Sequence, residues 1–293
     1  MSITASMVKE LRERTGAGMM ECKKALVEAD GDLDAAAEAL RAAGAAKADK
    51  KAGRVAADGR VVIQADGGKA VIAEINSETD FVAKDENFID FAEAVAAAAL
   101  ASGVTDAVAL ADVSIGSLTV EAARTELVQK VGENISVRRA DIVAGSGPIG
   151  TYTHGARIGA IVVLEGGDED LARDIAMHVA AINPTCIDES GVPAETLETE
   201  KRIFTEQAAE SGKPPEIIEK MIGGRINKFL KEITLVGQPF VKDDKQTVGQ
   251  LLKSADASVV SFTRYEVGEG IEKKVENFAD EVRKQIEDAK KQD

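Results

Sequence analysis

Apolar residues follow a helical spacing in the first fifty positions and an alternating spacing after them, which predicts two different kinds of structure. Residues 7–14, 19–29 and 33–43 are expected to form three short helices. Glycines separate these helices, at Gly16 and Gly18, at Gly31 and at Gly44. Their few apolar positions suffice for one small shared core, as in a satellite three-helix module.

A basic segment follows the three helices and contains Lys47, Lys50, Lys51 and Arg54. We interpret this segment as a solvated tether, and a contact with an acidic partner is the alternative. The three-helix module and its basic linker together are expected to occupy residues 1–54.

A β-hairpin is predicted next, because residues 60–64 and 70–76 alternate around Gly67-Gly68. Helices at 87–101 and 120–131 and a strand at 135–143 follow it. The second half repeats this order, with a hairpin at 151–153 and 158–165, helices at 171–182 and 248–255, and a strand at 259–267. The repetition indicates a duplicated core of two subdomains, at 55–144 and 145–269.

The two copies differ in two places. A long loop, residues 77–86, connects strand to helix in the first copy, whereas the second copy has only Gly166-Gly167 there. The second copy carries an insertion at about 188–232, in which residues 194–211 and 215–231 predict two antiparallel helices. After Gly270 the apolar spacing predicts a final amphipathic helix, so 270–293 forms a C-terminal helical module. The expected fold class is therefore α+β.

Composition narrows the choice of partners and compartment. The chain has 51 acidic and 36 basic residues and a net charge of -15, which argues against broad binding to nucleic acid and favours a positively charged protein partner. Cys22 and Cys186 stand in no disulfide or zinc-ligand pattern, which suits a reducing cytoplasm. A charged leader and an apolar run of roughly 20 residues are both missing, so we expect no membrane association.

Catalytic patterns are poor, so an enzyme is disfavoured and no cofactor or metal is expected. His154 and His178 stand in no metalloprotease spacing, and no nucleophile-elbow motif occurs. Residues 145–150 match the glycine pattern of dinucleotide-binding proteins, but they lead into a strand where such a site opens a helix. Residues 67–70 lack the rest of a phosphate-binding loop.

Phe81 can be interpreted in two ways from its setting. It can fold back onto the core that holds Phe88 and Phe91, or it can stand at the surface of its loop as an anchor for a partner pocket. For the adjacent Met19 and Met20, helical geometry predicts that one of the two stays exposed. His154, beside a turn glycine, is expected at the surface, and His178 is expected in the core.

Several long motifs carry a resemblance to a known family. They are ELRERTGAGMM at 10–20, TDFVAK at 79–84, HGARIG at 154–159, AMHVA at 176–180, GQPFV at 237–241, TVGQLLK at 247–253 and EVGEGIE at 266–272. With these motifs in order along essentially the whole chain, the sequence resembles the bacterial elongation factor Ts family. The resemblance implies a ubiquitin-associated-like N-terminal module, a two-subdomain core, an inserted helical pair and a C-terminal helix.

The resemblance also implies which residues meet the partner. The family's magnesium-displacing run matches Thr79, Asp80, Phe81 and Val82, with Asp80 and Phe81 as the intruding pair. Family contacts to the partner's nucleotide-binding domain match Lys9, Met19, Met20, Lys23 and Val241, and a further contact matches His154.

The function that the resemblance implies is that of a translation elongation factor without enzymatic activity. Such a factor binds the GDP form of elongation factor Tu and promotes exchange of GDP for GTP by disturbing the Mg site. A non-catalytic adaptor or chaperone-like binding module for a GTPase is the alternative. The helical insertion can serve in self-association, which makes a homodimer a further expectation.

Overall fold

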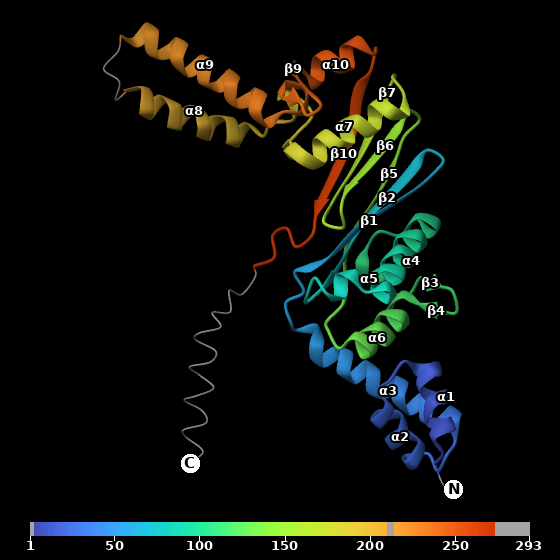
Figure 1. Cartoon of the computed structure of the whole chain (residues 1–293). Coiled ribbons are helices and arrows are strands. Elements are labelled where there is room, and N and C mark those ends of the chain that lie inside the picture. Colours follow the sequence, from blue (N-terminus) through green and yellow to red (C-terminus); the bar gives the residue numbers. More distant parts are fainter. Residues whose placement is uncertain (1–2, 210–213, 273–293) are drawn as a thin grey trace, which may run out of the picture.

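The computed structural model describes residues 3–209 and 214–272, with the N-terminal helices at one end of the molecule and the inserted helical pair at the other (Figure 1). Beyond residue 272, the predicted C-terminal helix lies outside the described residues.

Three helices form the N-terminal module, as predicted: α1 (Ala5–Thr15), α2 (Met19–Glu28) and α3 (Leu33–Ala52). Thr4 and Asp32 cap α1 and α3 by accepting hydrogen bonds from first-turn amides. The three helices share a small apolar core that includes Leu11, Leu26 and Leu40.

The third helix does not end at Gly44, so the predicted tether is wrong. It continues to Ala52, and the basic segment is its C-terminal part. Gly44 is buried against α6 (Val120–Val131), where an added Cβ would lie 2.6 Å from Gln129 Oε1. This glycine permits close helix packing instead of ending a helix, and Ala48, one turn further on, joins the core of the first subdomain.

We expect this continuous helix to make the core sensitive to a charge at Ala48. Ala48→Asp should lower the free energy of unfolding by ~3 kcal/mol or more, because it buries an unpaired carboxylate. Ala46→Asp is the matched control, since Ala46 is exposed on the same helix. Chemical denaturation measures the stability of both variants, and equal stabilities would indicate that this segment is a solvated tether after all.

The first subdomain is a three-stranded antiparallel sheet with helices on one face. Its strands are β1 (Asp58–Asp66), β2 (Lys69–Ser77) and β5 (Ser136–Ala144), in the order β1-β2-β5. Helices α4 (Glu86–Ser102) and α6 pack on it, and α5 (Ala107–Leu110) and the hairpin of β3 (Ser114–Ile115) and β4 (Leu118–Thr119) connect them.

The second subdomain repeats this topology. Its sheet has the order β10-β7-β6, from β6 (Ile149–His154), β7 (Ile158–Glu165) and β10 (Ser258–Glu266). Helix α7 (Glu169–Ile182), a hairpin of β8 (Pro239–Phe240) and β9 (Asp243–Thr247), and α10 (Val248–Ser254) follow the pattern of the first copy. In both copies the closing strand pairs with the second strand of the hairpin, as a duplication predicts. The short hairpin before the second helix was not predicted in either copy.

The inserted pair consists of α8 (Ala194–Ala209) and α9 (Pro215–Ile233), which lie side by side (Figure 1). Arg225 of α9 joins them, because its Nη1 donates to Gln207 Oε1 at 2.7 Å and its guanidinium lies 5.8 Å from the Phe204 ring centroid. The predicted antiparallel helices are therefore confirmed.

The two sheets pack face to face through a shared apolar core that includes Val61, Ile72 and Ile161. At the edge of this core lies Glu74 of β2, which is 0% exposed. Its carboxylate accepts hydrogen bonds from Arg138 Nη1 at 2.9 Å, Arg139 Nε at 2.7 Å and the Gly268 amide at 2.7 Å. Because Gly268 follows β10, this buried ionic network joins the two subdomains.

Candidate partner-binding site

The loop between β2 and α4 displays Phe81 at the surface of the first subdomain. Val82 and Ala83, in a 3₁₀ turn (Val82–Lys84), are buried in the subdomain core directly beneath it. Arg60 Nη1 also donates to the Ala83 carbonyl at 3.3 Å. Phe81 itself is 81% exposed, whereas Phe88, on the following helix, is 0% exposed. Of the two interpretations of Phe81, the structure supports the surface position on an anchored loop.

Asp80 stands beside Phe81 and is also exposed. Its Oδ2 lies 2.6 Å from Lys84 Nζ, one helical turn further on. This hydrogen bond lowers the pKa of Asp80, and the positive charge of Arg157 acts in the same direction. Asp80 therefore presents an ionised carboxylate beside an exposed ring, while Thr79 and Val82 face the protein.

His154 lies at the same end of the sheets as Phe81. The β6–β7 turn is tied to the start of β1, because the Val61 amide donates to the Ala156 carbonyl at 2.8 Å and Arg157 Nη1 lies 3.3 Å from Asp58 Oδ1. Asp58 in turn pairs with Ser77, where the Phe81 loop begins. His154 is exposed, and its Nδ1 lies 3.3 Å from Tyr152 Oη. The fold thus brings two distant predicted contacts to one end of the core.

Helix α2 exposes both methionines, where geometry had predicted one. Met19 is 60% and Met20 76% exposed, and Lys23 is exposed one turn later. Lys9 of α1 is also exposed and pairs with Glu13 at 3.7 Å. Val27, which was not predicted as a contact, is exposed seven residues after Met20 on the same helix face and extends this apolar surface.

Val241 lies in the β8–β9 turn with its side chain exposed, and the buried His178 holds its backbone in place. The Val241 amide donates to His178 Nδ1 at 3.2 Å, so the ring proton lies on Nε2, which donates to Gln238 Oε1 at 2.9 Å. Burial lowers the pKa of His178, more than the Gln238 hydrogen bond raises it. His178 is 0% exposed, which confirms its expected position in the core. Phe240 stacks on it, with ring centroids 6.1 Å apart.

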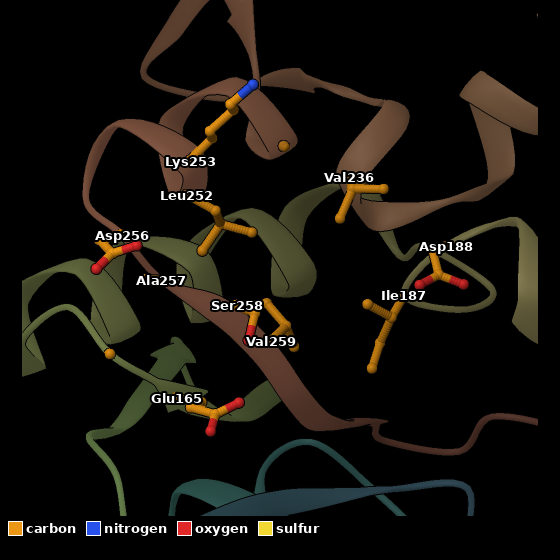
Figure 2. A pocket seen from close by; sticks show the side chains of 12 residues that line it. Glu165, Ile187, Asp188, Val236, Leu252, Lys253, Asp256, Ala257, Ser258 and Val259 are labelled. Atoms are coloured by element: carbon orange, nitrogen blue, oxygen red, sulfur yellow. The ribbon is translucent and has the colours of Figure 1, made fainter.

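A surface pocket of about 580 Å³ lies at the far end of β7 from His154 (Figure 2). Leu252, Val236 and Ile187 approach it from three separate segments (Figure 2). Its charged lining consists of Glu165, Asp188, Asp256 and Lys253. Three carboxylates against one ammonium group make it a poor cradle for a nucleotide phosphate.

Within residues 3–209 and 214–272, no group of three or more metal-ligating side chains gathers. In the same part of the chain, no helix has the length and apolar character that a membrane span needs.

Comparison with known proteins shows to which family the chain belongs. The family model described as elongation factor TS matches residues 78–269. Elongation factor Ts of Thioalkalivibrio sulfidiphilus is 60% identical over 99% of this chain and 100% of its own length. The chain belongs to the elongation factor Ts family. The corresponding factors of Alkalilimnicola ehrlichii and Methylococcus capsulatus are 60% and 59% identical, over 96% and 98% of this chain and 98% and 99% of their own lengths.

Membership of the elongation factor Ts family makes this protein a translation elongation factor. The match begins at Glu78, the first residue of the loop that displays Phe81. The N-terminal module lies before the matched residues, and the full-length relatives cover it.

Proposed function

We propose that this protein is the guanine-nucleotide exchange factor of elongation factor Tu and that the Asp80-Phe81 loop acts on the partner's Mg site. The observation that carries the proposal is the exposure of Phe81 on a turn whose neighbours Val82 and Ala83 are buried. An apolar ring on a rigid base suits insertion into a partner pocket, because little conformational entropy is lost on binding.

Nucleotide release follows from coupling between two ligands of the partner. GDP is held partly through Mg²⁺ that bridges phosphate oxygens, so an intruding side chain that disturbs the metal's surroundings weakens GDP binding. Factor and nucleotide then oppose each other's binding by the same factor. The exchange factor supplies no catalytic residue and leaves the GDP-to-GTP equilibrium to nucleotide concentrations. Because the partner works in translation, we infer a cytoplasmic location.

The remaining contacts would hold the partner while the loop acts. Met19, Met20 and Lys23, exposed on α2, would form one contact with the partner, and Lys9, exposed on α1, would add another. His154 lies at the end of the core that carries Phe81. Val241 adds a contact from the second subdomain. A protein that used only these surfaces, without acting on the metal, would be an adaptor.

The test is stopped-flow release of fluorescent GDP from elongation factor Tu. Micromolar factor should accelerate release strongly when Mg²⁺ is present. Chelating the metal should release GDP quickly with or without the factor, because the step that the factor promotes has then already occurred. If the factor binds elongation factor Tu stably in a pull-down but does not accelerate GDP release in the presence of Mg²⁺, the protein is an adaptor and not an exchange factor.

A further inference from the structure

Glu133, in the connection between α6 and β5, holds the base of the Phe81 loop. Its Oε2 accepts a hydrogen bond from the Thr79 amide at 3.0 Å, and its Oε1 accepts one from Thr79 Oγ1 at 2.6 Å. Both bonds are assisted by the carboxylate charge, which makes them stronger than bonds between neutral groups. Thr79 Oγ1 in turn accepts from the Val82 amide at 3.4 Å and so starts the turn that carries Phe81.

The neighbouring residue Asn134 secures the loop on its other side. Its amide donates to Glu78 Oε1 at 2.6 Å, and Glu78 also pairs with Arg54 at 3.5 Å. Asn134 Nδ2 donates to the Arg54 carbonyl at 2.8 Å, just beyond the end of α3. The two residues before the loop's exposed pair are therefore both held by the α6–β5 connection.

The second subdomain has no such arrangement at the equivalent place. There the connection from α10 to β10 packs directly on Gly166, where an added Cβ would lie 2.2 Å from the Asp256 carbonyl oxygen. The long loop and the residues that hold it thus occur together, in one of two copies with the same strand topology.

We infer that Glu133 is a positioning residue for nucleotide exchange, which acts by fixing Thr79 and thereby the direction in which Phe81 projects. The inference rests on the proposed function. Without the carboxylate the loop samples more conformations, and ordering it on the partner costs free energy at each encounter. Glu133→Ala should therefore slow GDP release by about 10-fold at limiting factor concentration.

A double-mutant cycle tests this, with Glu133→Ala, Phe81→Ala and the double variant in the GDP-release assay. If Glu133 acts through Phe81, the double variant should release GDP no more slowly than Phe81→Ala alone. Glu93→Ala is the control, since Glu93 is exposed on the helix that follows the loop, and it should leave release at the wild-type rate. Glu133→Gln keeps one acceptor and should restore part of the rate.

A further variant separates the positioning role of Glu133 from a general effect on stability. Should Glu133→Ala fold poorly, Thr79→Val removes only the hydroxyl that donates to Glu133 and should slow release by a smaller factor at an unchanged melting temperature. Additive losses in the cycle, or wild-type release by both Glu133→Ala and Thr79→Val while Phe81→Ala is slow, would overturn the inference alone. Wild-type release by Phe81→Ala would overturn the proposed loop mechanism together with it.

Discussion

Phe81→Ala is expected to slow factor-promoted GDP release from elongation factor Tu by about 10- to 100-fold. Burial of one Phe side chain in a partner pocket stabilises a complex by ~1.5–3 kcal/mol, and that stabilisation is lost. Because Phe81 is 81% exposed in the free protein, its removal should leave the melting temperature within about 2 °C of wild type. Stopped-flow release at high Mg²⁺ and a thermal melt measure the two quantities.

Phe88→Ala supplies the matched control for this prediction. Phe88 is 0% exposed in the core of the same subdomain, so its truncation should reduce the free energy of unfolding by ~3–5 kcal/mol. The two phenylalanines thus separate a loss of exchange from a loss of fold. A Phe81→Ala protein that melts far below wild type, or that keeps the full release rate, contradicts the role proposed for the loop.

Glu74→Ala is expected to reduce the free energy of unfolding by ~3 kcal/mol. The substitution leaves the guanidinium groups of Arg138 and Arg139 without their shared carboxylate and the Gly268 amide without its acceptor. Both arginine side chains keep some contact with water, which places the cost at the lower end of the range for a broken buried ion pair. Chemical denaturation measures it, and Glu93→Ala, at an exposed position, should remain near wild type.

The same network predicts how stability changes in acid. Burial raises the pKa of Glu74, but hydrogen bonds from Gly268, Asn76 and the two arginines outweigh it, so the pKa lies below its ordinary value of 4.5. A carboxylate with a depressed folded-state pKa contributes its full stability above the unfolded-state pKa and loses it as the pH falls through the folded-state pKa. Below about pH 4.5, wild type should therefore lose stability more steeply than Glu74→Gln. If the stability of wild type and of Glu74→Gln falls equally steeply with pH, protonation of Glu74 does not contribute to the loss of stability in acid.

The repeat of hairpin, helix, helix and strand was readable from the sequence because each element buries one face and so keeps a clear period. The short hairpins β3–β4 and β8–β9 escaped prediction because β3, β4 and β8 have only two residues each, too few to show alternation, and the five residues of β9 are all polar. Gly44 was wrongly predicted to end the third helix. A glycine inside a helix is indistinguishable in sequence from one that ends it, and only the proximity of Gln129 explains it.

The sequence by itself determined the order of hairpin, helix, helix and strand, its duplication and the position of the long loop in the first copy, because these follow from local periodicity and from residues adjacent in the chain. Only the tertiary structure decided that Phe81 faces solvent, since its burial depends on how Val82 and Ala83 pack on the core beneath it. The pairing of Thr79 with Glu133, 54 positions apart, was likewise invisible in sequence. A hydrogen bond between distant residues leaves no period, and it exists because the fold brings the end of α6 beside the end of β2.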